Sequence, residues 1–426
     1  MGRIAGRFPR VEPRRRAREL VLGLVSDLPS KNCWTLSEHA GGATPDGLQH
    51  LLRKAVWDTD GVRDDLRSYV VEHLGSTDAV LVVDETGDLK KGCHTVGVQR
   101  QYTGTAGRIE NSQVAVYLTY AGSSGHALID RALYLPKSWA DDTERRATAG
   151  VPDEVEFATK PALAREMITR ALDNGAAAPW VAGDEVYGAD PGLRGELERR
   201  GVGYVLAVAC SHPVTTAAGK LRADAIASKL PRRAWQRQSA GNGSKGPRFY
   251  DWAWVTIDAA ADDSQRSGQR WLLIRRNNGT GELAYYRCYA PEPVPLRALV
   301  RVAGRRWTVE ESFQASKGLA GLDQHQVRRW ISWQRWTVLA MIAYAFLAVL
   351  AAIERSVNPT PDGLIALTCN EIHHLFNVLI MKPISSLRHR LRWSTWRRQH
   401  QHRAKTSHYQ RRAAANYDDH DLRLSY

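Results

Sequence analysis

The chain has 426 residues, of which 43% are hydrophobic and 24% are charged, and it carries a formal net charge of +14. This composition excludes wholesale disorder, and the length allows two or three domains with a large core. The five cysteines form no CxxC pair, which argues against a zinc finger or a disulfide framework, and the basic excess indicates a polyanionic partner.

Residues 1–75 are predicted to form a helical, basic region. The stretches 34–42 and 44–53 have the pattern of two helices around a glycine turn, with Thr44 as the cap of the second helix and Pro45 at its first position. This layout resembles a helix-turn-helix, so we expect the region to contact DNA, although an ordinary helical hairpin has the same pattern. The first residues lack an apolar signal core, which is typical of a cytoplasmic protein.

Residues 76–209 alternate strand and helix patterns. Five strands are predicted, at 79–84, 113–121, 126–135, 180–184 and 204–209. Helices are predicted at 160–173 and 191–200, one before each of the last two strands. This order is that of an RNase H-like α/β core, in which the first and fourth strands lie side by side.

Residues 210–300 change character and are predicted to form a β-rich insertion. Strand patterns at 252–257, 271–276 and 284–289 are separated by turn-rich stretches such as 241–246. Residues 301–353 return to helix. Their apolar run at 337–353 is short for a membrane span and rich in alanine, so we interpret it as a buried core helix and expect no membrane partner.

Residues 354–426 are predicted to form a small helical unit followed by a basic tail. The stretch from Arg388 to Arg412 is rich in arginine, contains one lysine and has no acidic residue, and Trp393, Trp396 and Tyr409 lie within it. Such a run is typical of a solvated arm that binds nucleic acid, and a basic surface helix is the alternative. The predicted fold is therefore α/β, with an RNase H-like mixed-sheet core, a β-rich insertion and helical N- and C-terminal regions.

Three acidic residues stand at positions that this fold would bring together. Asp84 and Asp184 end the first and fourth predicted strands, and Glu310 lies in the helical stretch after the insertion. Phosphodiester cleavage can use two Mg²⁺ or Mn²⁺ ions about 4 Å apart, and these hard cations prefer carboxylate oxygens. We therefore interpret Asp84, Asp184 and Glu310 as catalytic residues that hold two metal ions.

Each of the three acids is followed by a second acidic residue, so the metal ligand at each position could instead be that next residue. Glu85 and Glu185 follow the two aspartates, and Glu311 follows Glu310. Side chains alternate along a strand, so the two glutamates should point to the opposite face, which favours the aspartates.

Basic residues near the three acids are candidates for DNA contacts. On the predicted helix, Arg306 and Lys317 share a side with Glu310 and would hold phosphates, although a structural ion pair is the alternative. The segment after Asp84 contributes Lys90, Lys91 and Arg100 in a sequence that suits a loop against a DNA backbone.

Several stretches in order resemble a known family. They are VLVVDETGDLKKG, GVQRQYTGTAGRIENSQVAVYL, ALIDRALYLPKSWADD, FATKPALAREMI, WVAGDEVYG and RRWTVEESFQASKGLAGLDQHQVRRW. They are similar to the DDE transposases of the insertion sequence 701 family. The resemblance implies an RNase H-like core with a β insertion before the last acid. It also implies Mg²⁺-dependent cut-and-paste movement of a DNA element that has terminal inverted repeats.

The resemblance can be carried to individual residues. The family's Asp-Asp-Glu triad falls on Asp84, Asp184 and Glu310. Related insertion sequences have a Tyr-Arg-Glu-Lys signature, and Arg306, Glu310 and Lys317 match its last three members. Its tyrosine position is Ala303, a departure that removes any phosphate contact of that tyrosine. The resemblance further implies double-stranded DNA partners (the element ends and the target), a homodimer on the paired ends and a nucleoid-associated location.

Three functions are compatible with these observations. The leading hypothesis is a DDE transposase that cuts the element ends and joins them to target DNA. The second is a DNA-binding regulator, or domesticated copy, that lacks catalysis. The third is a nuclease with the same core that performs no strand transfer.

Overall fold

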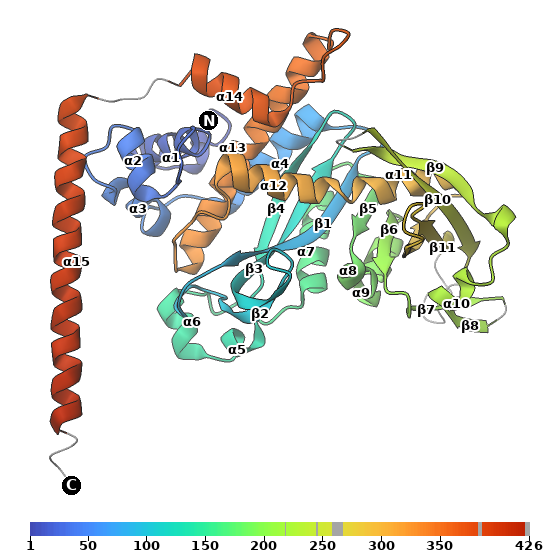
Figure 1. Ribbon diagram of the computed structural model, residues 1–426, viewed down its shortest axis with the longest axis horizontal. Coiled ribbons are helices and arrows are strands. Elements are labelled where there is room, and N and C mark those ends of the chain that lie inside the picture. Colours follow the sequence, from blue (N-terminus) through green and yellow to red (C-terminus); the bar gives the residue numbers. More distant parts are fainter. Residues whose placement is uncertain (218, 244–245, 258–266, 382–385, 422–426) are drawn as a thin grey trace.

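The computed structural model describes residues 1–217, 219–243, 246–257, 267–381 and 386–421 (Figure 1). Its centre is one ten-stranded sheet in the order β2-β3-β1-β5-β6-β12-β11-β10-β9, with β4 also paired to β3, and a small second sheet pairs β7 with β8. The strands are β1 (Val80–Leu89), β2 (Gln99–Thr103), β3 (Arg108–Ala121), β4 (His126–Leu133), β5 (Trp180–Gly183), β6 (Gly203–Val208), β7 (Pro213–Thr216), β8 (Gly219–Arg222), β9 (Gln236–Gly243), β10 (Gly246–Thr256), β11 (Gln269–Arg276) and β12 (Leu283–Ala290).

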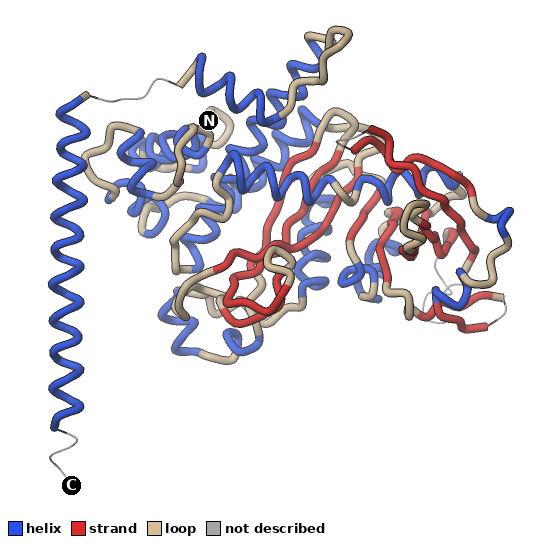
Figure 2. Tube along the Cα trace, in the orientation of Figure 1, coloured by secondary structure: helices blue, strands red, loops and turns tan. Residues whose placement is uncertain are grey.

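Helices pack around this sheet and form most of the N- and C-terminal regions (Figure 2). The α-helices are α1 (Val11–Leu24), α2 (Cys33–His39), α3 (Asp46–Arg53), α4 (Thr59–Leu74), α5 (Lys137–Ala140), α6 (Thr143–Ala149), α7 (Lys160–Asp173), α8 (Glu185–Gly188), α9 (Pro191–Arg199), α10 (Ala223–Ala227), α11 (Leu296–Arg305), α12 (Thr308–Ala320), α13 (Trp330–Val357), α14 (Cys369–Leu379) and α15 (Leu387–Asp421). Two 3-10 helices are η1 (Ala5–Arg7) and η2 (Arg232–Ala234).

The half of the sheet made by the first core strands has the predicted RNase H-like order. Its neighbours run β4-β3-β1-β5-β6, so the first and fourth core strands are adjacent. β3 runs antiparallel to β1, whereas β5 and β6 run parallel to it. Parallel neighbours need crossover connections, and α7 and α9 lie in the connections before β5 and β6. The predicted α/β fold class is confirmed.

β1 is longer than the sequence predicted. The strand that was expected to end at Asp84 continues to Leu89, because Asp84 to Leu89 pair with Tyr117 to Ser112 of β3. β5 pairs with β1 only as far as Val83 and Gly183. The parallel ladder therefore stops at Asp84 while the antiparallel ladder goes on.

The β-rich segment after residue 209 extends the core sheet. β12 pairs antiparallel with β6, and β11, β10 and β9 follow outward. The predicted strand at 252–257 overlaps β10, and those at 271–276 and 284–289 lie within β11 and β12. In the turn-rich stretch, residues 241–243 belong to β9 and Gly246 to β10, and residues 244–245 lie outside the described part of the chain.

α13 is the central helix of the molecule. It is long and apolar enough to cross a membrane, but 78% of its apolar window is buried inside the protein. It packs against α1, α3, α4, α12, α14 and β4. The interpretation of residues 337–353 as a buried core helix is confirmed.

The N-terminal region is helical, as predicted, and contains both expected short helices, α2 and α3. The predicted cap of α3 was wrong by one residue. Pro45 is the N-cap and Asp46 the first helical residue, and the Thr44 hydroxyl lies 2.9 Å from the Asp46 carboxylate, to which it donates. α2 begins with a capping box that Asn32 and Thr35 form.

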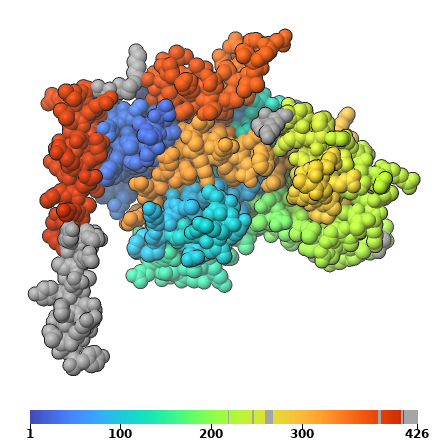
Figure 3. All heavy atoms as spheres, in the orientation of Figure 1, coloured from blue at the N-terminus to red at the C-terminus, as the bar shows by residue number. Residues whose placement is uncertain are grey.

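The basic tail forms the helix α15, and the predicted alternative of a basic helix on the protein surface agrees with its first turns. Its first turns dock on the N-terminal region (Figure 3). The Trp393 ring is buried, and its Nε1 donates to the Gly42 carbonyl oxygen at 2.8 Å. Trp396 packs edge-on against Trp34 of α2. The rest of α15 leads away from the body of the molecule (Figure 1).

Candidate active site

Asp84 and Asp184 lie side by side at the end of the parallel ladder. The register pairs Val83 of β1 with Gly183 of β5, and the two aspartates are the next residues on these adjacent strands. Asp184 turns the chain into α8 as its N-cap, because its Oδ1 accepts from the Val186 amide at 2.9 Å. The structure thus brings two of the three predicted acids together.

The pair carries an excess of negative charge in a poorly solvated position. Asp84 is 7% exposed. Burial and, second, repulsion by Asp184 together raise the pKa of Asp84 to about 8, although the Arg306 guanidinium offsets part of the shift. Burial and the nearby Glu85 carboxylate also raise the pKa of Asp184. Two crowded carboxylates are the donor set that hard divalent cations prefer, so the pair fits the expected Mg²⁺ or Mn²⁺.

Two cations approach β1, one before and one after Glu310 in the chain. Arg306, at the junction of α11 and α12, places Nη1 3.6 Å from the Asp84 carboxylate. Lys317 donates from Nζ to the Thr86 hydroxyl at 2.8 Å and lies 3.5 Å from the Asp88 carboxylate. The segment from Arg306 to Lys317 therefore runs along β1 from Asp84 onward.

Glu310 lies on this same face but is exposed. Its carboxylate forms no hydrogen bond or ion pair with any other residue that the structure describes. Among the described residues, no three His, Cys, Asp or Glu side chains are grouped closely enough to hold a metal ion. Asp84 and Asp184 are thus adjacent, whereas Glu310 lies apart from them on α12.

The acidic neighbours of the three residues have other surroundings. Glu85 accepts from Lys160 Nζ and from the Tyr187 hydroxyl, each at 2.6 Å. Glu185 is exposed on α8. Glu311 lies 3.3 Å from His126 of β4, which lowers the pKa of Glu311. Because Glu85 and Glu311 are engaged elsewhere, the surroundings favour Asp84 and Glu310 within their pairs.

The remaining predicted residues divide into exposed and engaged ones. Lys91 and Arg100 are exposed. Lys90 is half-buried, and its Nζ lies 3.1 Å from the His325 carbonyl oxygen. Ala303, at the tyrosine position of the signature, is buried in α11.

Sequence reasoning missed a buried cluster next to Lys317. His325 Nε2 lies 3.1 Å from the Asp88 carboxylate, and the His325 side chain is fully buried. Hydrogen bonding to His325 keeps the pKa of Asp88 low in spite of burial, which alone would raise it. Both residues lie in the stretches that resemble the family, but they are far apart in the chain and no spacing in the sequence relates one to the other.

Comparisons with known proteins agree on one kind of enzyme. The family model described as DDE superfamily endonuclease matches residues 3–245, and that described as transposase DDE domain matches residues 157–346. A curated protein of Microchaete diplosiphon, the probable transposase for insertion sequence element IS701, is 29% identical over 210 residues. That match covers 49% of this chain and 52% of the relative, so the chain spans about half the length of that relative.

Two solved structures are similar at a low level. The piggyBac transposase synaptic complex with hairpin DNA gives a TM-score of 0.40 at 12% identity, covering 90% of this chain and 75% of that chain. The NurA nuclease from Sulfolobus solfataricus gives 0.28 at 10% identity, covering 62% and 86%.

Proposed function

The chain belongs to the DDE superfamily endonuclease family, and on that premise we propose that it is a transposase. It would cut the ends of a DNA element and join them to target DNA. The observation that carries the proposal is the juxtaposition of Asp84 and Asp184 at the end of the β1–β5 ladder. The similarity to the IS701 transposase supports the same function.

Asp84, Asp184 and Glu310 are the proposed ligands of two Mg²⁺ ions, for which Mn²⁺ can substitute. When bound, the ions would activate the attacking oxygen and neutralise the leaving one. Asp184 keeps its orientation because the Val186 amide holds its Oδ1. Arg306 and Lys317 would hold the phosphates on either side of Glu310. Arg306 lies near Asp84, and it would exchange part of this contact for a phosphate oxygen.

The other proposed DNA contacts come from the segment after β1. Lys91 and Arg100 are exposed and free to meet a phosphate backbone. Lys90 Nζ donates to the His325 carbonyl oxygen in the segment after α12. Its proposed contact with DNA therefore requires that the ammonium group also reach a phosphate from this position. We further propose a homodimer on paired element ends, in the bacterial cytoplasm near the nucleoid.

The test uses purified protein and a DNA fragment that carries its gene with both flanks. We expect breaks at two inverted sequences with Mn²⁺ and none with EDTA. Asp184→Asn removes the charge but keeps an oxygen that can cap α8, so it should abolish the breaks and leave DNA binding intact. The matched control is Asp173→Asn, at an exposed residue that pairs with Arg200, and it should cut normally. Cleavage that survives Asp184→Asn would overturn the site assignment.

The same assay separates the two alternative functions. Salt-sensitive binding at the flanks without any metal-dependent break would identify a regulator or an inactive domesticated copy. Breaks whose 3′ ends never join a target molecule would identify a nuclease without strand transfer.

A further inference from the structure

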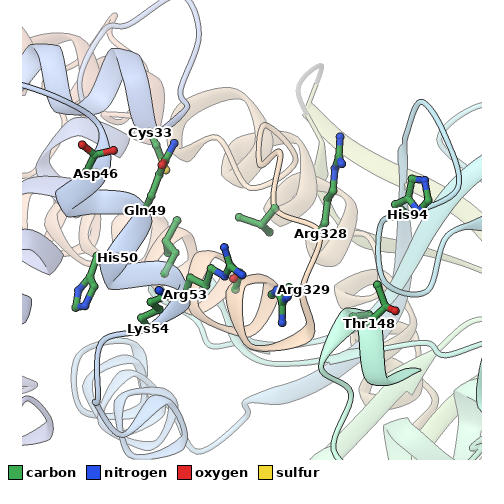
Figure 4. Close-up of a pocket in the computed structure, with 14 residues that line it drawn as sticks. Cys33, Asp46, Gln49, His50, Arg53, Lys54, His94, Thr148, Arg328 and Arg329 are labelled. Atoms are coloured by element: carbon green, nitrogen blue, oxygen red, sulfur yellow. The ribbon is translucent and has the colours of Figure 1, made fainter. Parts of the chain in front are cut away.

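A cavity of about 840 Å³ lies between α3 and the segment that leads into α13 (Figure 4). The end of α6 and His94, from the segment after β1, line another side. Neither Asp84 nor Asp184 lines it. We call this cavity the α3 groove.

The α3 groove is lined by basic residues from two separate elements. Arg53 and Lys54 come from the end of α3, and Arg328 and Arg329 come from the segment before α13 (Figure 4). Within the described part of the chain, none of these four side chains has a hydrogen-bond or ion-pair partner. The acidic lining residue, Asp46, is exposed and takes a hydrogen bond from Thr44.

This lack of partners contrasts with two other arginines of the N-terminal region. Arg7 lies 2.8 Å from the Asp65 carboxylate, and Arg63 lies 2.8 Å from that of Asp60. Arg7 and Arg63 are therefore neutralised within the protein, whereas the four cations of the groove are not. Around the α3 groove the like charges repel one another until an anion enters.

The α3 groove is tied to the proposed active site through the backbone. The Val96 amide donates to the Arg328 carbonyl oxygen at 3.0 Å, and Lys90 contacts the carbonyl oxygen of His325. These contacts join one wall of the groove to the far end of β1. Leu89, at that end, is five residues from Asp84, or about 17 Å along an extended strand.

We infer that the α3 groove binds the phosphate backbone of duplex DNA several base pairs from the bond that is cut. The inference deepens the proposed function and rests on it for the identity of the polyanion. Cations spread over two elements of an open cavity suit a chain of phosphates better than one small anion. DNA in this position would contact α3 and the segment between α12 and α13.

The test compares two double variants that remove the same charge. Arg53→Gln with Arg329→Gln takes one cation from each wall of the groove. The control is Arg232→Gln with Arg233→Gln, at exposed residues of η2, which follows α10 at the opposite end of the molecule from α3 (Figure 1). Circular dichroism melting verifies that both variants fold. Fluorescence anisotropy then measures binding of a short duplex of arbitrary sequence in EDTA.

The expected signature is a change in salt dependence. Each lost phosphate contact makes the negative slope of log K against log salt less steep by about 0.9. Between about 50 and about 200 mM salt, the groove variant should therefore lose roughly 12-fold less affinity than the wild type. The control should keep the wild-type slope. A groove variant that matches the control would overturn the inference.

The two proposals fail separately, because binding in EDTA needs no metal ion and no cleavage. If Asp184→Asn blocks cleavage while the groove variant binds like the control, the proposed function stands and the groove assignment falls. If the wild type never cuts DNA but the groove variant shows the less steep salt dependence, the groove assignment stands and the proposed function falls.

Discussion

Gly304 fixes the distance between α11 and the edge of the sheet. A Cβ at this residue would overlap the Ala240 carbonyl oxygen of β9. Arg248 spans the same contact, with Nη2 3.3 Å from the Ala240 oxygen and 3.2 Å from the Gly304 oxygen. Because α11 leads directly to Arg306, this close approach also positions the cation next to Asp84.

Gly304→Ala is expected to lower the free energy of unfolding by about 1–3 kcal/mol, because the added methyl group must displace backbone. Gly318 is the matched control, since it also lies in a helix but a Cβ there meets nothing within 4 Å. Gly318→Ala should raise the free energy of unfolding by about 1 kcal/mol through helix propensity. Chemical denaturation measures both. Equal effects of the two substitutions would contradict the proposed fit of α11 on β9.

At the scale of elements, α15 depends on a small aromatic anchor. Trp393 is fully buried and Trp396 packs on Trp34. Arg397 adds a contact with Glu38, 2.6 Å from its carboxylate. The first turns of a helix that otherwise leads away from the body are thereby fixed to α2.

Trp393→Ala should release α15 without unfolding the rest of the protein. Loss of a buried tryptophan costs about 3–5 kcal/mol, so the population of undocked helix should rise by roughly a hundred-fold to several thousand-fold. Trypsin cleavage between Leu387 and Arg398 should accelerate accordingly, because cleavage follows the open population. Leu391→Ala, at a residue that is 59% exposed, should leave the cleavage rate unchanged. A large drop in the melting temperature would contradict separate docking.

The elements that the sequence predicted well are those with a strong apolar pattern. β5 and the helix at 160–173 were found where expected, because a buried strand and an amphipathic helix have clear periods. The second part of β1 was missed because Glu85, Thr86 and Asp88 interrupt the apolar run. Its pairing with β3 is a tertiary contact that local pattern does not encode.

The candidate site could be predicted in part for the same reason. Asp84 and Asp184 follow apolar strands whose order implied adjacency, and the register agrees. The partners of Glu85, which are Lys160 and Tyr187, come from two other elements. No spacing in the sequence relates these residues, so only the folded chain reveals them.

For the whole molecule, strands β9 to β12 of the insertion form one sheet with the core strands. β12 pairs with β6 along Tyr285 to Tyr289, so the two halves share a continuous hydrogen-bond ladder. Trp252 and Cys288 of the insertion belong to the same hydrophobic core as Val83 of β1. Strand pairing and this shared core therefore hold the insertion against the core strands.

Hydrogen exchange should report this continuity. Amides of β12 and β11 should exchange as slowly as those of β1 and β5, because all open with the same core. β7 and β8, which form a separate two-stranded sheet, provide the internal control and should exchange faster. Mass spectrometry of exchanged peptides makes the measurement. An insertion whose strands exchange together with β7 and β8 would contradict a single cooperative sheet.

The central place of α13 has a consequence for how the protein is made. α1, α3 and α4 all pack on α13, yet α4 ends at Leu74 and α13 begins at Trp330. At about 5–20 residues per second, the ribosome needs roughly 10 to 50 s to cover that interval. During this time the faces of α1, α3 and α4 that pack on α13 remain without it. We therefore expect the nascent chain to depend on chaperones until α13 emerges.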